Sequence, residues 1–298
     1  MTKQKKKETM RKVISLVSII GFLGCTVVLI YPVISDRWNR YRDMQLIAEY
    51  NNTIKNMPEK DYSELFRKAQ EYNDYLRKQN RNIVTDAEYE PDDYYETLLD
   101  PSGNGMMCYI EIPKIDITEP VYHYSTEVSL GAGIGHIHGS SLPTGGASTH
   151  SVLTGHRGLP NQKFFSDLNK LQPGDNFYIH ILGKVLAYKV YDIQTILPTD
   201  VDALMIEDNK DLVTLVTCTP YGVNTHRLLV MGERIPYNDQ DVDDNGLVTA
   251  EKHAVIIDPS VWVLVGFALF LLIFIVFSRI RKRMENKKDQ QEKEKNNG

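Results

Sequence analysis

The sequence has little cysteine and no excess of basic residues. Its three cysteines, Cys25, Cys108 and Cys218, are odd in number and far apart, so they match neither a disulfide framework nor a zinc-binding pattern. The net charge is -5, whereas surfaces that bind nucleic acid are usually basic. We therefore expect no nucleic-acid partner, no metal site and no cofactor.

Glycine and proline are not enriched either, with 19 and 13 among 298 residues, which excludes a collagenous or fibrous chain. The composition of 42% hydrophobic and 24% charged residues is typical of a chain that folds around a core. At this length we expect one main domain with attached segments, rather than two enzymatic domains.

Two long runs without charge are present, at residues 13–35 and 259–278. Each has about 20 residues or more, which is enough for a helix to cross the hydrocarbon core of a bilayer. The first is longer than the apolar part of a signal peptide and lacks a cleavage site, although a cleaved signal is its alternative. The second carries Trp262 near one end, as membrane interfaces favour, and its alternative is a buried core helix. We predict two transmembrane helices.

Basic residues lie directly outside both runs. They are Lys3, Lys5, Lys6, Lys7, Arg11 and Lys12 before the first run, and Arg279, Arg281, Lys282 and Arg283 after the second. Positively charged flanks of membrane spans stay on the cytoplasmic side, so residues 1–12 and 279–298 are predicted to be cytoplasmic tails. The chain is then a two-pass cell-membrane protein whose residues 36–258 are extracellular.

Residues 36–104 are predicted to form a helical arm. Its second half is amphipathic, because Leu65, Tyr72 and Leu76 belong to an apolar series at helical spacing. Pro58 divides the arm into two helices, since proline inside a helix removes a hydrogen bond and clashes with the preceding turn. The pattern leaves open whether the arm is a passive stalk or a regulatory element.

Residues 105–237 are predicted to be mainly β. Short apolar runs such as MMCYIEIP, NFYIHIL and LVTLVTC are separated by turn clusters at LPTGG, LQPGD and PYGVN. This texture is typical of a closed or sandwiched all-β domain.

Residues 238–258 are polar and acidic, and they are predicted to be a linker to the second membrane span. Asp241, Asp243 and Asn245 match the opening of a calcium-binding loop. The twelfth position of that loop is Lys252 instead of the glutamate ligand, so a solvated linker is favoured over a calcium site.

Candidate chemistry lies in two segments of the β domain. In SVLTGHRGLP, an apolar strand is expected to end at His156, which lies in a turn flanked by glycines. In TLVTCTPYGVNTHRLLV, Cys218 ends one strand and Arg227 opens the next, so the two residues lie opposite each other if these strands pair. A thiol, an imidazole and a guanidinium are sufficient for acyl transfer through a thioester.

The cysteine segment resembles the signature of sortases, and GHRG resembles their histidine motif. The run GSSLPTGGASTHSVLTGHRGLP, together with YIEIPKI, is similar to the class C, pilin-polymerising branch, which is found in Gram-positive bacteria. The resemblance implies an eight-stranded sortase β-barrel in which Cys218, His156 and Arg227 are catalytic. It also implies cleavage of an LPXTG-like sorting signal between Thr and Gly, and transfer of the acyl group to a pilin lysine.

Class C members commonly have a lid with an Asp-Pro-aromatic motif over the cysteine. Asp86 and Tyr89 in TDAEY are the favoured candidates, although proline is absent between them. Asp100 and Pro101 are the alternative, but Ser102 follows them and they almost adjoin the first expected strand.

Three other functions stay open at this point. A housekeeping sortase that anchors proteins to the cell wall is the nearest alternative, and a hydrolytic cysteine peptidase would use the same thiol and imidazole. A non-catalytic adhesin or scaffold would not need Cys218.

Several remaining residues have structural interpretations. The LPTGG segment at residues 142–146 is expected to be a loop of the domain and not a sorting signal, because a catalytic segment follows it. His136 and His138 are expected to be surface histidines, since no third metal ligand has suitable spacing. Cys108 is expected to be a buried core thiol.

Overall fold

The structure is a computed structural model that describes residues 3–79, 92–159 and 162–237, together with residues 266, 270 and 274. The chain divides into two compact units, Met1–Val33 with Lys252–Gly298, and Ile34–Glu251. The second unit contains the β domain and the candidate catalytic residues.

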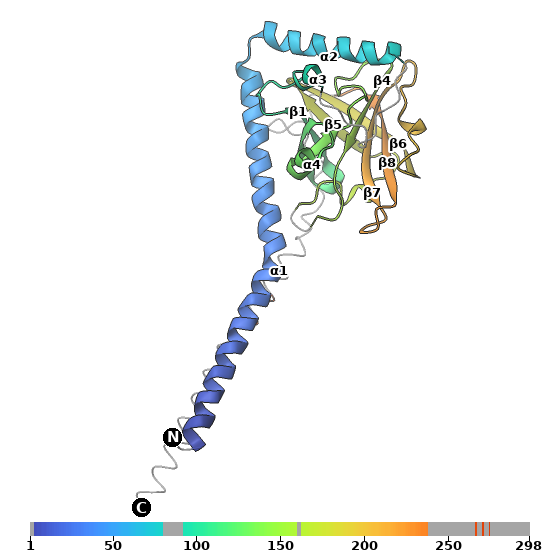
Figure 1. The fold of residues 1–298 in the computed structure, drawn as a ribbon. Helices are drawn as coiled ribbons and strands as arrows, with labels where there is room; N and C mark the ends of the chain where they lie inside the picture. The colour runs from blue at the N-terminus through green and yellow to red at the C-terminus, as the bar shows by residue number, and fades with distance from the viewer. Residues whose placement is uncertain are drawn as a thin grey trace, which may run out of the picture. The chain divides into compact units, whose positions relative to one another are not determined.

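Two helices form the N-terminal part of the chain. α1 spans Lys3–Asn56 and α2 spans Glu59–Gln79, so the break falls at Pro58 as the sequence predicts. α1 runs from the predicted tail through the predicted membrane span into the arm (Figure 1), so these segments are one helix and not separate elements. The change from apolar to polar residues does not end the helix, because its hydrogen bonds are all between backbone groups.

α1 includes the segment Ile20–Asn56, which is long and apolar enough to cross a membrane. The second predicted span, residues 259–278, lies outside the described residues except for Gly266, Phe270 and Phe274, which are helical. Within the first unit, the rings of Phe22 and Phe270 stack with their centroids 5.0 Å apart. Two membrane spans therefore stay a prediction, and the first of them has a matching helix.

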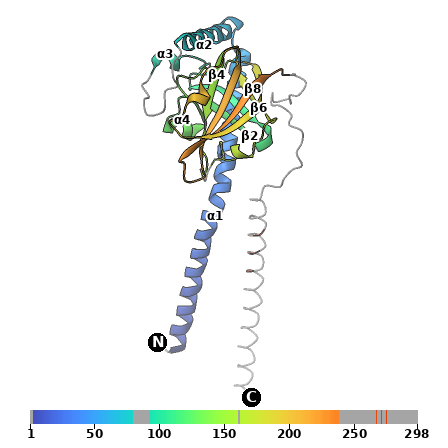
Figure 2. The same ribbon diagram turned by 90° about the vertical axis from the view of Figure 1, so that its right-hand side faces the viewer.

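The β domain is a closed barrel of eight strands (Figures 1 and 2), which confirms the fold that the sequence predicts. The strands are β1 Met106–Ile112, β2 Ile117–His123, β3 Ile134–His136, β4 Thr149–Thr154, β5 Asn176–Ile181, β6 Lys184–Ile196, β7 Asp211–Thr219 and β8 His226–Ile235, and they follow one another around the barrel in the order β1-β2-β3-β4-β7-β8-β6-β5. The β2–β3 and β4–β7 pairs are parallel, and the other pairs are antiparallel.

Short helices lie before the first strand and in the connections between the strands. They are α3 Asp93–Glu96, α4 Glu127–Ala132, and the single-turn 3-10 segments η2 Pro113–Ile115, η3 Leu168–Lys170 and η4 Asp202–Leu204.

α2 lies across one end of the barrel in both views (Figures 1 and 2). Its predicted apolar face is buried there, since Ala69, Tyr72 and Leu76 join the main core together with Tyr95 from α3. Burying one large apolar side chain contributes about 1.5–3 kcal/mol. The second half of the arm is therefore packed on the β domain.

α1 also packs on the barrel through its C-terminal part. Ile47 and Tyr50 form a small apolar cluster with Met106 and Tyr109 of β1. The Tyr50 hydroxyl donates to the carbonyl of Met107 at 3.1 Å, so its polar atom is satisfied inside the contact.

The LPTGG segment is part of the folded domain, as expected. Leu142 is fully buried, and its backbone N–H and C=O both bond the side chain of Asn73 on α2, at 2.7 and 3.1 Å. Asn73 also donates to the hydroxyl of Thr144 at 3.0 Å. A segment held in this way is not available as an extended substrate.

The expectation of a surface position is wrong for His136. It lies at the end of β3 with no exposed surface, and its Nε2 donates to the carbonyl of Ser141 at 2.9 Å while its Nδ1 accepts from the Tyr95 hydroxyl at 2.7 Å. Burial lowers the pKa of His136 to about 3, so the ring is neutral. His138 lies beyond β3, half-buried, with its Nε2 3.7 Å from the carboxylate of Asp92.

Candidate active site

Cys218 and Arg227 face each other across two neighbouring strands. Cys218 is the second-last residue of β7 and Arg227 is the second residue of β8, and they are register partners in the antiparallel pair, as the sequence predicts. Side chains directly opposite each other on such a pair have Cβ atoms about 4.5–5.5 Å apart. Both residues are half-buried, which leaves the thiol and the guanidinium reachable from solvent.

His156 reaches the same region through β4, which runs parallel to β7. Thr154, the last residue of β4, is the register partner of Val216. The next residue continues this ladder, because Gly155 N donates to the Val216 carbonyl at 3.1 Å and its carbonyl accepts from the Thr217 hydroxyl at 2.8 Å. His156 therefore directly follows Gly155, which is hydrogen-bonded to the two residues that precede Cys218. It is half-buried like the other two.

Glycine is required at both ends of the histidine turn. A Cβ at Gly155 would lie 2.6 Å from Ile134 Cδ1 and 2.9 Å from the Phe165 ring, too close for any side chain. Gly158 has a φ of +86°, and a Cβ there would lie 2.8 Å from the Tyr221 ring. The GHRG motif is thus a turn whose Gly155 packs closely against Ile134 and Phe165, and whose Gly158 packs against Tyr221 of the β7–β8 loop.

The Arg227 guanidinium is oriented by its own loop. Its Nη1 donates to the carbonyls of Asn224 and His226, both at 3.2 Å. In the described part of the chain its other nitrogens make no hydrogen bond, so they can donate to a bound oxygen. A fixed cation next to a thiol supplies the electrostatic stabilisation that a tetrahedral oxyanion needs.

One residue of this region was not singled out from the sequence. Arg157 directly follows His156, and its Nη1 donates to the hydroxyl of Thr219, the neighbour of Cys218, at 3.1 Å. In the sequence, Arg157 is marked only by its place directly after the candidate histidine. That place does not reveal that its hydrogen-bond partner lies 62 residues further along the chain.

The two predicted lid residues, Asp86 and Tyr89, lie outside the described residues. The alternative, Asp100 with Pro101, forms part of a turn before β1, where the Asp100 carboxylate accepts from Asn104 N at 3.1 Å. This bond gives Asp100 a structural role.

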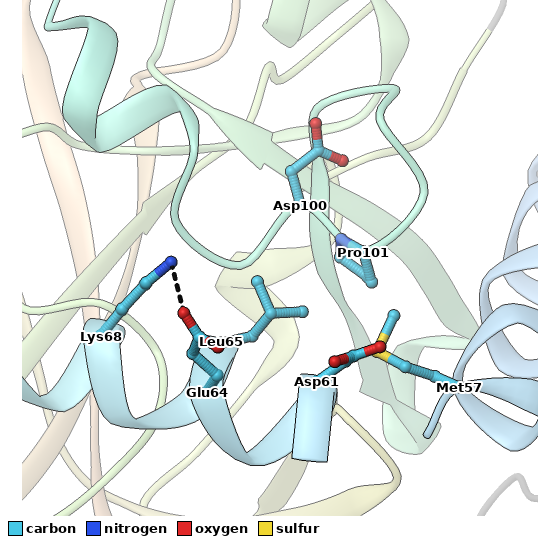
Figure 3. Close-up of a pocket in the computed structure, with 7 residues that line it drawn as sticks. All are labelled: Met57, Asp61, Glu64, Leu65, Lys68, Asp100 and Pro101. Carbon is cyan, nitrogen blue, oxygen red and sulfur yellow. Dashed lines mark ion pairs between the residues drawn. The ribbon is translucent and has the colours of Figure 1, made fainter. Parts of the chain in front are cut away.

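A cavity of about 310 Å³ opens beside that turn (Figure 3). It is lined by Met57, Asp61, Glu64, Leu65, Lys68, Asp100 and Pro101, and the Lys68–Glu64 ion pair of 2.9 Å lies at its edge. The cavity contains none of the three candidate catalytic residues, so it is a separate feature. Across the described ranges, no cluster of three or more His, Cys, Asp or Glu side chains has the arrangement of a metal site.

Comparison with known proteins gives these three residues a context. Residues 110–235 match the family model of the sortase domain. The solved structure of sortase C1 from Streptococcus agalactiae is 44% identical, covers 65% of this chain and 100% of that one, and has a TM-score of 0.61. The solved structure of a sortase C from Streptococcus pneumoniae is 41% identical, covers 65% of this chain and 97% of that one, and has a TM-score of 0.59. That structure is described as giving insights into catalysis and pilin substrate specificity.

A curated relative is more distant. Sortase A of Bacillus anthracis is 28% identical over 127 residues, which are 42% of this chain and 58% of that protein. The chain thus spans a little over half of this relative, whereas it spans the whole of the solved S. agalactiae structure.

Proposed function

The chain belongs to the sortase family of cysteine transpeptidases and resembles its class C members in structure, and from this premise we propose that it polymerises pilins. Its donor substrate is a protein with an LPXTG-like sorting signal, and its acceptor is a lysine side chain of a pilin subunit. The similarity to the S. pneumoniae sortase C, whose structure bears on pilin substrate specificity, supports a pilin substrate.

In the first step, the Cys218 thiolate attacks the carbonyl carbon of the threonine in the sorting signal. The S–C bond forms, and the carbonyl oxygen becomes an oxyanion that the free N–H groups of Arg227 stabilise. His156 gives a proton to the glycine nitrogen as the C–N bond breaks, which leaves a thioester on the enzyme.

In the second step, the lysine amine attacks the thioester carbonyl. The new C–N bond is an isopeptide bond, and the C–S bond breaks to return Cys218. His156 accepts the proton that the amine loses, so it is ready for the next cycle. No cofactor takes part in either step.

The observation that carries this proposal is the meeting of three strand ends. Cys218 and Arg227 are register partners, and Gly155 bonds β7 two residues before the cysteine. The neighbouring positions of Cys218, Arg227 and the residue before His156 support the roles of nucleophile, oxyanion donor and acid-base group for the three side chains.

The proposal is tested with the full-length chain in detergent micelles, an LPXTG-type peptide and a lysine-containing acceptor peptide. We expect mass spectrometry to find the acyl group joined to the lysine amine and to exceed the hydrolysed product. A peptidase would give the hydrolysed acid at any amine concentration, and a wall-anchoring sortase would prefer a glycine-type α-amine to the lysine side chain.

We further propose that the enzyme is held in the cell membrane, with its catalytic domain outside the cell and both tails in the cytoplasm. The candidate span Ile20–Asn56 and the basic residues before it support this location. Protease added to intact cells is expected to remove the barrel and to leave a tag on either terminus protected.

A further inference from the structure

A side-chain hydrogen bond joins the turn that carries the candidate acid-base group to the strand end that carries the nucleophile. Arg157, next to His156, donates from Nη1 to the Oγ1 of Thr219, next to Cys218, at 3.1 Å. Each partner is thus the immediate chain neighbour of a catalytic residue. Loss of this hydrogen bond is therefore expected to shift His156 relative to Cys218.

Tyr221 makes a second contact between the same loops. Its ring centroid is 5.9 Å from Cζ of Arg157, within the range of a cation–π interaction, and its hydroxyl donates to the Gly158 carbonyl at 3.5 Å. The side chain is 63% exposed, so burial in the core does not hold it in place. Its place is set by these contacts with the histidine turn and by the missing side chain at Gly158.

The base of the histidine turn is fixed from one side by the following segment. Phe165 N donates to the His156 carbonyl at 3.1 Å, and Gly158 N donates to the Ser166 hydroxyl at 3.0 Å. These bonds hold the backbone of the turn but do not reach the β7–β8 loop. Arg157, together with the Tyr221 hydroxyl, makes that connection.

We propose that Arg157 is a positioning residue for the transfer reaction, which holds the His156 turn against the end of β7 through Thr219 and Tyr221. A guanidinium suits this role because one of its nitrogens donates to Thr219 while its central carbon lies over the Tyr221 ring. Proton transfer needs the reacting heavy atoms about 2.6–3.2 Å apart, so a small displacement of the turn has a large effect on rate.

The first test measures kcat and KM for cleavage of an LPXTG-type peptide by the full-length chain in detergent micelles. For Arg157→Ala we expect kcat to fall by about 10- to 100-fold while KM stays within about threefold, since binding groups are unchanged. Arg157→Lys keeps the charge but not the fork, so it should recover only part of the loss. Thr219→Val removes the acceptor, and added to Arg157→Ala it should cause no further loss, because both changes break the same bond.

The second test does not depend on the substrate, so its failure is distinct from a failure of the proposed function. It measures the rate of Cys218 alkylation by iodoacetamide as a function of pH, with the modified residue identified by mass spectrometry. If Arg157 positions His156, the Arg157→Ala profile moves towards that of His156→Ala. A purely structural role would leave the profile of the folded molecules as in the wild type.

Arg234→Ala is the matched control. Arg234 lies 5.5 Å from the centroid of Tyr188 and 3.9 Å from the carboxylate of Asp211, and it is seven residues further along β8 than Arg227. It makes a cation–π contact with a tyrosine as Arg157 does, but its other partner is a carboxylate near the opposite end of β8 from Arg227, so its loss should change neither kcat nor the alkylation profile.

Wild-type kcat and alkylation profile in a folded Arg157→Ala enzyme would overturn the proposal. If Arg157→Ala does not fold, Arg157→Lys and Thr219→Val decide the matter, because both are milder changes. Unchanged kcat per titrated Cys218 in these two folded variants would equally overturn it.

Discussion

Cys108 and Cys218 lie on strands of the same barrel, but their surroundings differ. Cys108 is in the middle of β1, where every residue is buried, and burial raises the pKa of its thiol so that it stays protonated. Cys218 is near the end of β7, half-buried and opposite a guanidinium. The same side chain is therefore inert at the centre of a strand and placed for chemistry at its end.

The strongest test of this comparison removes each thiol in turn. Cys218→Ala should abolish both cleavage of the sorting signal and formation of the isopeptide product, since no other group can form the thioester. Cys108→Ala should retain kcat and lower the free energy of unfolding by about 1 kcal/mol, the cost of deleting a small buried group. Product ladders formed by Cys218→Ala, measured by gel and mass spectrometry, would disprove the assignment.

The next largest effect is expected from the cation that distinguishes the site of Cys218. Arg227→Lys keeps the charge but loses the planar set of donors, so we expect kcat/KM to fall by about 10²–10³-fold, as for loss of one oxyanion donor. Steady-state kinetics with the peptide measure this. Activity within about threefold of wild type would show that Arg227 is structural.

The parts of this site that the sequence predicts are those set by local pattern. β-branched residues and the turn that contains Pro220 predict two strands, and they place Cys218 opposite Arg227 if these strands pair, as the structure shows that they do. Arg157 was missed because its function depends on Thr219, which only the fold brings near.

The fold shows the same division between local and distant information. The all-β character of the domain follows from its short apolar runs and turn clusters, and the eight-stranded barrel was implied by the family resemblance, whereas the burial of His136 follows from neither. It depends on Tyr95, which comes from a segment 41 residues earlier and supplies the hydrogen bond that makes a buried imidazole acceptable. Hydrophobic periodicity holds no information about such a partner.

The arm gives a third prediction, which separates stability from catalysis. Asn73→Ala would leave the buried N–H and C=O of Leu142 without their partner, so we expect a loss of about 3 kcal/mol in the free energy of unfolding. Urea titration of the full chain in detergent measures it. Kinetics per titrated Cys218 should change little, in contrast to Arg227→Lys.

Glu71→Ala on the same helix is the control for Asn73. Its carboxylate pairs with Arg67 on the exposed face of α2, and exposed ion pairs add little to stability. If the two alanine variants were equally stable, the contact between α2 and the LPTGG loop would contribute nothing.

The last prediction concerns a half-buried acid that, unlike the Cys108 thiol, titrates in an accessible pH range. Glu119 on β2 has a carboxyl oxygen that is buried without a hydrogen-bond partner among the described residues. Burial, with the nearby Asp43 carboxylate, raises the pKa of Glu119 to about 8, and the cations Arg40 and Arg42 oppose the rise. The folded state therefore holds a proton that the unfolded state releases.

The sign of the pH dependence follows from this difference. The stabilisation is fully present below the ordinary glutamate pKa of about 4.3 and is lost as pH rises to about 8, with a slope of at most about 1.4 kcal/mol per pH unit. Glu119→Gln should flatten this slope and be more stable than wild type at pH 8, because the amide has no charge to bury. Urea titrations of both proteins from pH 5 to pH 9 measure the slopes, and equal slopes would mean that Glu119 is ionised at neutral pH in the folded chain.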